Sequence, residues 1–312
     1  MRVSVSGTGL VNLPDFIVPG SAKAGTTAAW MLLRGHPEVF VPDVKEPRFF
    51  SAERRVDDSH PDRHDVFEGA ITDIREYAAL YETAPDSTML GDFSPTYLYK
   101  AAVSVKAIKQ IYSQKNKWKH IRFIVFVRNP VEVAWSLYWS NRRFLKEHLD
   151  FRKAISESIH RSSNPYLDYV GFASYSSGIE TYMNAFPREN ILTVLSEDFR
   201  KDNVATVRSI LHHLNCDDSY TPPDSGADFN PSGRPRSRLL TFLIFGNSPL
   251  AKTSRLLPAQ IRHEIKLRIA RMLFQKMEMN SNTRKELMPV FETEILKLEQ
   301  LLGLDLGHWR KT

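Results

Sequence analysis

Cysteine is almost absent from the sequence, and long apolar runs are missing. Cys216 is the single cysteine among 312 residues, which excludes an intrachain disulfide and a zinc site built from several cysteines. The longest apolar stretch, residues 239–250, is interrupted by Gly, Asn and Pro and falls well short of the roughly 20 residues that a membrane-spanning helix needs. We therefore expect neither metal or redox chemistry nor a transmembrane helix.

The charge balance and the first residues limit the partners and the location. Residues 1–16 lack the apolar run and the cleavage site of a signal peptide, so we expect a cytoplasmic protein. The chain has 42 basic and 36 acidic side chains, an excess that suits an anionic ligand but is too small to require nucleic acid. Since no repeat or clear linker divides the 312 residues, we expect a single domain over residues 1–312.

Short apolar runs alternate with helical patterns along the chain. The expected strands, each with its following helix, are 15–20 with 26–34, 120–128 with 129–144, and 190–196 with 203–215. Strands separated by helices predict a three-layer α/β/α fold with a central parallel sheet. Asn129 is the expected N-cap of the second helix, with Pro130 at its first position.

Two polar segments are expected to be irregular. Residues 197–202 are expected to form a loop between the third strand and its helix. Residues 52–73 are polar and unpatterned, which predicts an excursion over the surface. His60 and His64 within it are either solvated side chains, which is the more common case, or metal ligands.

The first strand leads into a loop, Gly20 to Gly25, of the form G-x-x-x-x-G. A nucleoside triphosphatase would follow this loop with Lys and then Ser or Thr, but here Thr26 and Thr27 follow and the cation is Lys23 inside the loop. Backbone N–H groups and the helix dipole at such a turn make an anion site. The alternative is an ordinary glycine-containing turn.

The second strand ends in Arg128, where a triphosphatase would place an Asp for magnesium. Ser136 lies eight residues later, roughly two helical turns into the following helix. Because a guanidinium binds phosphate oxygens bidentately, Arg128 and Ser136 are candidates to hold a second phosphate without a metal. The alternative is a surface arginine beside a helix cap.

Six segments together resemble the sulfotransferases that use 3′-phosphoadenosine 5′-phosphosulfate (PAPS), in the branch of heparan-sulfate-type and bacterial carbohydrate or lipid enzymes. They begin with "PDFIVPGSAKAGTTAAWMLLRGHPEVFVPDVKEPRFFS", run through "GDFSPTYLY", "FIVFVRNPVEVAWSLYWSNRR", "ASYSSGIETYMNAFPRENILTVLSEDF" and "PSGRPRSRLL", and end with "LEQLLGLDLGHW". The resemblance implies one sulfotransferase domain with a P-loop-kinase-like fold. It also implies that Arg128 and Ser136 bind the 3′-phosphate, and that the 5′ end is held by the loop residues Ser21, Ala22, Lys23, Ala24, Gly25, Thr26 and Thr27.

The resemblance also implies a division of catalytic roles. Transfer of a sulfuryl group leaves charge on the departing phosphate, and Lys23 is placed to stabilise that charge without a metal. Glu46 matches the residue that takes the proton of the acceptor hydroxyl, and the following Pro47 biases its backbone toward an extended conformation. Lys45 is a further candidate for contact with the acceptor or with the sulfate donor.

Other positions carry weaker expectations. Phe93 stands where several heparan-sulfate-type relatives have Lys, which disfavours an acidic polysaccharide, and Asp92 is either a pocket carboxylate or a buried structural one. Tyr175 matches a tyrosine near the nucleotide, although core packing would also explain it. Gly233 and Arg234 resemble a late loop that closes over the donor, where Arg236 and Arg238 add charge or form a solvated basic turn.

Residues 259–278 have a helical pattern with an apolar stripe (Ile261, Ile265, Ile269, Leu273) beside a basic face. Such a helix packs on the core or makes peripheral contact with an anionic membrane. A carbohydrate, glycolipid or other small alcohol is the expected acceptor, and the sequence does not fix an oligomeric state. A P-loop kinase and a noncatalytic nucleotide-binding module are the alternative functions.

Overall fold

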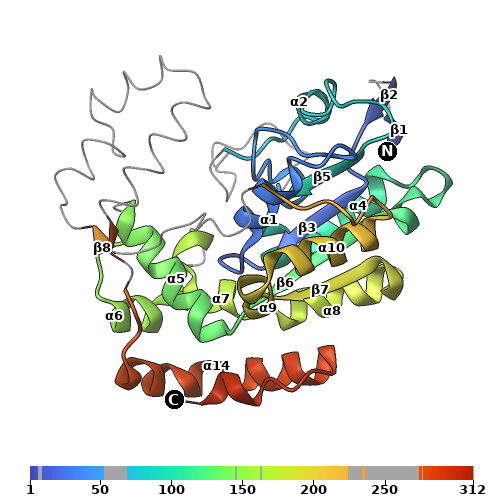
Figure 1. Cartoon of the computed structure of the whole chain (residues 1–312). Helices are drawn as coiled ribbons and strands as arrows, with labels where there is room; N and C mark the ends of the chain where they lie inside the picture. The colour runs from blue at the N-terminus through green and yellow to red at the C-terminus, as the bar shows by residue number, and fades with distance from the viewer. Residues whose placement is uncertain are drawn as a thin grey trace, which may run out of the picture.

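A five-stranded parallel sheet with the order β4-β5-β3-β6-β7 forms the centre of the computed structural model (Figure 1). The structure describes residues 1–5, 9–52, 69–144, 146–161, 164–223, 234–235, 274–275 and 277–311. The strands of this sheet are β3 (Phe16–Gly20), β4 (Val39–Phe40), β5 (Met89–Phe93), β6 (Arg122–Val127) and β7 (Ile191–Leu195). β1 (Arg2–Val5) with β2 (Gly9–Asn12), and β8 (Arg234–Pro235) with β9 (Phe274–Gln275), form two small antiparallel pairs.

Helices of several lengths connect and cover the strands. The α-helices are α1 (Thr26–Leu33), α2 (Ile74–Ala79), α3 (Thr96–Tyr99), α4 (Ala101–Ile111), α5 (Pro130–Arg143), α6 (Phe151–Ser156), α7 (Tyr169–Ala173), α8 (Ser176–Ala185), α9 (Ser196–Lys201), α10 (Asn203–Leu214) and α14 (Ser281–Leu302). The 3-10 turns are η1 (Phe49–Ser51), η2 (Gln114–His120), η3 (Ser158–Arg161), η4 (Pro165–Leu167), η5 (Arg188–Asn190) and η7 (Gly307–Arg310).

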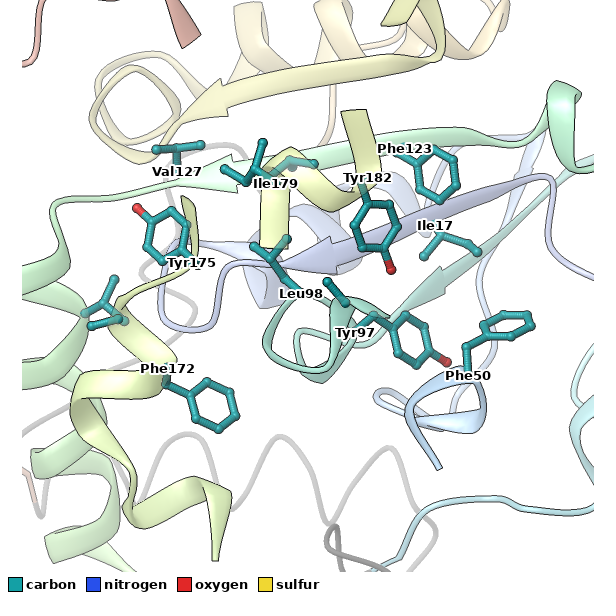
Figure 2. Close-up of a cluster of buried hydrophobic side chains, with 14 of the residues drawn as sticks. Ile17, Phe50, Tyr97, Leu98, Phe123, Val127, Phe172, Tyr175, Ile179 and Tyr182 are labelled. Carbon is teal, nitrogen blue, oxygen red and sulfur yellow. The ribbon is translucent and has the colours of Figure 1, made fainter. Parts of the chain in front are cut away.

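The alternation of side chains on β6 separates two cores. Phe123, Val125 and Val127 belong to one buried cluster, which also contains residues of α4, α8 and α14 and is drawn in part in Figure 2. Ile124 and Phe126 belong to the other, together with residues of α1 and α10. Successive residues of a strand face opposite sides of the sheet, so helices cover both faces. The predicted three-layer α/β/α architecture is confirmed.

The three expected strand-and-helix units are present as β3 with α1, β6 with α5, and β7 with α10. Asn129 caps α5, because its Oδ1 accepts a hydrogen bond from the Val131 N–H at 3.0 Å, and Pro130 is the first helical residue. Asn129 thus fixes where the chain turns from β6 into α5. This turn carries Arg128.

The prediction of a loop at residues 197–202 is wrong for residues 197–201, which belong to the helix α9. Glu197 and Asp198 lie in its first turn and Arg200 and Lys201 in its last, an order that complements the helix dipole. Phe199 is 3% exposed and packs edge-on against Phe126 of β6. Burial of this one aromatic ring therefore favours a helix where the polar composition indicated a loop.

The C-terminal helix α14 was not expected from the sequence. Asn280 caps it by accepting a hydrogen bond from the Thr283 N–H at 2.7 Å, and Gly303 ends it with a φ of 66°. α14 packs against α5 and α8, and Figure 1 shows it running along their side of the molecule. Its buried stripe consists of Leu287, Met288, Phe291, Glu294, Ile295 and Leu298.

Several predictions concern residues outside the described part of the chain. These are His60 and His64, Gly233, Arg236 and Arg238, the apolar stretch 239–250 and the stripe within 259–278. Arg234 is described only as part of β8. Among the helices of the described ranges, none has the length and hydrophobicity to cross a bilayer.

Candidate active site

The loop of residues 21–25 joins the carboxyl end of β3 to the first turn of α1. The Ser21 N–H donates to the Phe126 carbonyl at 2.7 Å, which ties the loop to the neighbouring strand β6. Gly25 has a φ of 115°, and a Cβ there would stand 2.9 Å from the Phe199 ring, so glycine is required for both reasons. The Ser21 Oγ is buried and has no hydrogen-bond partner among the described residues.

The other loop positions follow the strand-loop-helix geometry that the sequence predicted. Ala24 and Thr26 are buried, whereas Ala22 and Thr27 are partly exposed. Thr26 and Thr27 form the first turn of α1, where free backbone N–H groups favour an anion. The loop therefore has the geometry of an anion site, and binding of a nucleotide there stays a prediction.

Lys23 lies in this loop with a φ of 63° and a half-buried side chain. Burial, together with the nearby positive charges of Arg143 and Arg128, lowers the pKa of Lys23 to about 7, while Glu46 acts in the opposite direction. The described residues offer no hydrogen bond or ion pair to its ammonium group. An anion beside Lys23 would therefore be bound favourably and would restore the positive charge.

Arg128 follows the last residue of β6 and lies against the same loop. Its Nη1 donates to the Lys23 carbonyl at 2.6 Å, and its Nη2 donates to Glu132 Oε2 at 3.0 Å. Burial lowers the pKa of Arg128, while Glu132 acts in the opposite direction. The Arg128 Nε is buried without a partner in the described part of the chain. Arg128 and the loop that carries Lys23 are thus in direct contact, and the predicted role of each in binding a nucleotide stays a prediction.

Tyr175 and Ser136 approach the same turn from separate helices. The Tyr175 hydroxyl accepts from the Arg128 N–H at 2.9 Å and donates to the Arg128 carbonyl. Ser136 is 7% exposed and lies in α5, eight residues after Arg128. Tyr175 therefore bonds the backbone of the Arg128 turn and is also part of the buried core. Its contact with a nucleotide, and a phosphate shared by Arg128 and Ser136, stay predictions.

Glu46 lies between two cations. Lys45 Nζ is 2.7 Å from Glu46 Oε1, and Arg48 Nη2 is 3.0 Å from Glu46 Oε2. Burial acts to raise the pKa of Glu46, but Lys45 and Arg48 outweigh it and lower the pKa to about 2. Glu46 is therefore ionised at neutral pH and oriented by both neighbours.

The expectation of an extended backbone at Glu46 is wrong. Its φ is 62°, in the left-handed region, and Arg48 follows with a φ of 58°. The Glu46 N–H donates to the Phe93 carbonyl at 3.1 Å, and the Arg48 N–H donates to the Ser94 Oγ at 3.1 Å. These bonds to β5 and the segment after it, together with the two ion pairs, hold a backbone conformation that the local sequence disfavours.

Asp92 and Phe93 are core residues of β5. Asp92 is 1% exposed and accepts hydrogen bonds from the hydroxyls of Tyr77 and Tyr97, both at 2.6 Å, and of Ser94 at 2.7 Å. Phe93 is 2% exposed and meets Phe16 edge-on. Of the two interpretations of Asp92, this geometry is that of the buried structural carboxylate, and Phe93 points into the core.

The sequence analysis missed three charged residues of the site. Arg48 pairs with Glu46, and its signal was a cation two positions after the candidate base. Glu132 pairs with Arg128 at the i, i+4 spacing of a helix, which the sequence displays. Arg284 of α14 also pairs with Glu132, and no local pattern could have indicated a contact across 152 residues.

Comparison with known proteins identifies the family to which this site belongs. Residues 14–220 match the sequence profile of the sulfotransferase family. The matched range holds Lys23, Glu46 and Arg128, whereas the predicted Gly233 and Arg234, and Arg284, lie beyond it. The chain belongs to the sulfotransferase family. The family predicted from the sequence is thereby confirmed.

Individual relatives of this sulfotransferase-family chain are distant. It is 24% identical over 246 residues to human carbohydrate sulfotransferase 15, covering 65% of this chain and 44% of the human protein. It is 23% identical over 139 residues to the membrane-associated sulfotransferase kil1 of Dictyostelium discoideum, covering 45% of this chain and 25% of that protein. The chain thus spans less than half the length of these curated relatives.

One solved structure supports the fold. The crystal structure of a sulfotransferase from Alicyclobacillus acidocaldarius superposes with a TM-score of 0.70 at 23% identity, covering 96% of this chain and all of that one. The sulfotransferase fold is therefore shared across nearly the whole chain. In the described residues, no group of three or more His, Cys, Asp or Glu side chains is arranged to hold a metal ion.

Proposed function

We propose that the chain transfers a sulfuryl group from PAPS to a hydroxyl acceptor. The observation that carries this proposal is the convergence of Lys23, Arg128 and Glu46: Arg128 donates to the Lys23 carbonyl, and both Arg128 and Glu46 act on the charge of Lys23. A cation, a phosphate-binding guanidinium and an oriented carboxylate are the groups that sulfuryl transfer to an alcohol needs. Membership of the sulfotransferase family supports the same reaction.

Two buried hydrogen-bond donors without a partner among the described residues fit an anionic ligand such as PAPS. Ser21 Oγ and Arg128 Nε are both buried without a partner among the described residues, and a phosphate oxygen would satisfy either of them. PAPS supplies an activated sulfuryl group and carries two phosphates. In this proposal the 3′-phosphate binds Arg128 and Ser136, and the late residues Gly233 and Arg234 close over the nucleotide. The 5′ end binds the loop residues Ser21, Ala22, Lys23, Ala24, Gly25, Thr26 and Thr27.

Lys23 stabilises the charge that develops on the departing phosphate. Its side chain is half-buried, and its ammonium has no ion pair in the described part of the chain that would have to be broken first. The N–H groups at the start of α1 add to this effect. Loss of one such donor in other enzymes costs about 3–4 kcal/mol of barrier, and we expect a similar contribution from Lys23.

Glu46 accepts the proton of the acceptor hydroxyl. Lys45 and Arg48 keep the carboxylate ionised and fix its direction, and they also make it a weaker base than an ordinary glutamate. Proton transfer to Glu46 is therefore favourable only after the acceptor oxygen has begun to bond to sulfur and its acidity has risen. In this proposal Lys45, which pairs with Glu46, also contacts the acceptor.

A carbohydrate hydroxyl is the acceptor class to test first, since one relative is named as a carbohydrate sulfotransferase. Glycolipids and other small alcohols are the next classes. Phe93 faces the core and not a binding surface, so this position supplies no cation for an acidic polysaccharide. Asp92 and Phe93 would shape an acceptor site only through the backbone of β5.

The decisive experiment measures turnover with radiolabelled PAPS against a panel of hydroxyl acceptors, after titration calorimetry with adenosine 3′,5′-bisphosphate and adenosine 5′-phosphate. We expect tighter binding of the bisphosphate and transfer to at least one acceptor in the presence of EDTA. Equal affinity for the two nucleotides would contradict the proposal, and binding without turnover on any acceptor would favour a noncatalytic module. Loss of activity on chelation that magnesium restores would favour a kinase. The family match does not favour a kinase.

Location and assembly belong to the same proposal. We propose a cytoplasmic enzyme that binds no nucleic acid, and cell fractionation tests the location. Contact of residues 259–278 with an anionic membrane is a separate proposal, which cosedimentation with anionic vesicles at low salt tests. The oligomeric state requires a direct measurement.

A further inference from the structure

One carboxylate connects the proposed 3′-phosphate site to the C-terminal helix. Glu132, in the first turn of α5, accepts from Arg128 through Oε2 at 3.0 Å and from Arg284 of α14 through Oε1. The side chains of Arg128, Glu132 and Arg284 are 17%, 28% and 24% exposed, so solvent only partly screens their charges. Glu132 thus lies between two guanidinium groups.

Two further contacts hold the C-terminal segment at this end of the sheet. The Glu294 carboxylate of α14 accepts from the Ser176 N–H at 2.6 Å and from the Ser176 Oγ at 2.8 Å, at the first residue of α8. The Asn129 side-chain amide donates to the Trp309 carbonyl at 3.0 Å. Residues 281–310 lie beyond the family match, which ends at residue 220. They nevertheless contact Asn129, the neighbour of Arg128 in sequence, and Ser176, the neighbour of Tyr175.

The charges explain why a second arginine is needed. Burial acts to raise the pKa of Glu132, but Arg128 and Arg284 together lower it, so the group is a carboxylate at neutral pH. A carboxylate bonded to Arg128 would repel a phosphate approaching the same guanidinium. Arg284 compensates that negative charge from the other carboxylate oxygen.

We propose that Arg284 is a positioning residue of the 3′-phosphate site, which neutralises Glu132 and so allows Arg128 to bind a phosphate beside that carboxylate. This inference rests on the proposed function, because it assumes that Arg128 meets the 3′-phosphate. It assigns a role in donor recognition to a helix outside the matched part of the family. The ligand chemistry is that of a nucleotide with a phosphate on its 3′ oxygen.

Titration calorimetry on the full chain tests this role with adenosine 3′,5′-bisphosphate and adenosine 5′-phosphate as probes. Arg284→Ala should weaken binding of the bisphosphate by about 10- to 100-fold. Its affinity for adenosine 5′-phosphate should stay within about twofold of that of the unchanged protein. Arg284→Lys keeps the positive charge, so its affinity for both nucleotides should stay within about threefold of that of the unchanged protein.

A double substitution separates charge compensation from a merely structural tether. In Glu132→Gln with Arg284→Ala, no carboxylate remains to be neutralised, so affinity for the bisphosphate should recover to within about threefold of the unchanged protein. A tether would not recover, since this variant also lacks the contact between α5 and α14. Arg152→Ala is the matched control. It breaks the exposed 2.6 Å ion pair between Arg152 of α6 and Glu286, which lies in α14 as Arg284 does.

The outcomes distinguish this inference from the function on which it rests. Unchanged bisphosphate affinity in Arg284→Ala, or failure of the double variant to recover, overturns the inference alone. Equal affinity of the unchanged protein for the two nucleotides overturns the proposed function and the inference with it. A loss of affinity in Arg152→Ala as large as in Arg284→Ala would assign the effect to helix docking and would also overturn the inference.

Discussion

The Tyr175 hydroxyl binds both backbone groups of Arg128, accepting from its N–H at 2.9 Å and donating to its carbonyl. Tyr175 is 2% exposed, precedes the first residue of α8 and belongs to the cluster drawn in Figure 2. The turn between β6 and α5 is therefore held by a side chain from a third element. The hydroxyl thus holds the backbone from which the Arg128 side chain extends toward the Lys23 carbonyl and Glu132.

Tyr175→Phe tests this relationship, since it keeps the ring and removes the hydroxyl. The Arg128 N–H and carbonyl lose their partner, and we expect unfolding in urea to show a loss of about 1–3 kcal/mol. Affinity for adenosine 3′,5′-bisphosphate should fall about tenfold, because the backbone that carries the Arg128 guanidinium is no longer held in place. Tyr112→Phe is the control, because its hydroxyl donates to the distant Pro14 carbonyl at 2.9 Å. That variant should lose stability but keep nucleotide affinity.

Much of the fold could be predicted because its central strands are apolar and its helices carry local caps. β3 and β6 are buried along nearly their whole length, and Asn129 with Pro130 marks the start of α5. β5 could not be predicted in this way, since it contains Asp92. Its carboxylate is tolerated in the core only because hydroxyls from Tyr77 and Tyr97 reach it, and no local pattern shows that.

The candidate site was predictable where its residues follow strand ends. Lys23 and Arg128 lie at the carboxyl ends of adjacent parallel strands, so topology alone brings them together. The backbone of Glu46 was mispredicted because bonds to the Phe93 carbonyl and to two cations outweigh the local effect of Pro47. Arg284 could not be predicted, since its partner Glu132 is 152 residues away.

Asp92→Asn distinguishes a structural from an acceptor-binding carboxylate. The amide cannot accept from all three hydroxyls that now donate to Asp92, so we expect unfolding in urea to show a loss of about 1–3 kcal/mol. KM for the acceptor should stay close to that of the unchanged protein. Asp86→Asn, at a side chain that is 95% exposed, is the control for stability. A raised KM with unchanged stability would instead show that Asp92 contacts the acceptor.

Lys23 should take up a proton when the nucleotide binds. Its pKa of about 7 leaves it mostly neutral at pH 8, and a bound phosphate stabilises the ammonium form and raises that pKa. Calorimetry at pH 8 in buffers of different ionisation enthalpy should therefore show net proton uptake, which is smaller at pH 6, where Lys23 is already charged. Lys23→Met should abolish this difference between the two pH values, whereas Lys106→Met, at an exposed position, should keep it.

Lys23→Ala should separate catalysis from donor binding. If the ammonium stabilises charge on the departing phosphate, single-turnover rates should fall about 100- to 1,000-fold, while the loop amides and Arg128 retain most of the bisphosphate affinity. Single-turnover assays and calorimetry on the same preparation measure the two effects. Equal losses in rate and in affinity would mean that Lys23 contributes binding that is uniform in the ground and transition states.

Glu46→Gln should remove the proton acceptor and leave the donor site intact. Loss of a positioned base lowers turnover about 100- to 10,000-fold, whereas affinity for adenosine 3′,5′-bisphosphate should stay within about twofold. Glu38→Gln, at an exposed position, is the control. Near-normal turnover in Glu46→Gln would mean that another group takes the proton.

The pH dependence of the rate tests the same assignment through Arg48. With a pKa of about 2, Glu46 stays ionised over the working range, so the rate should not fall near pH 4.5, where an ordinary glutamate titrates. For the same reason Glu46 stabilises the fold above about pH 4.5, and that contribution is lost as the pH falls toward 2. Arg48→Met removes one of the two cations and should raise the pKa of Glu46. The fall of the rate at low pH, the acid limb of the profile, should then occur at a higher pH that can be measured. The double variant with Glu46→Gln should lack that limb, and its persistence there would assign it to a different group.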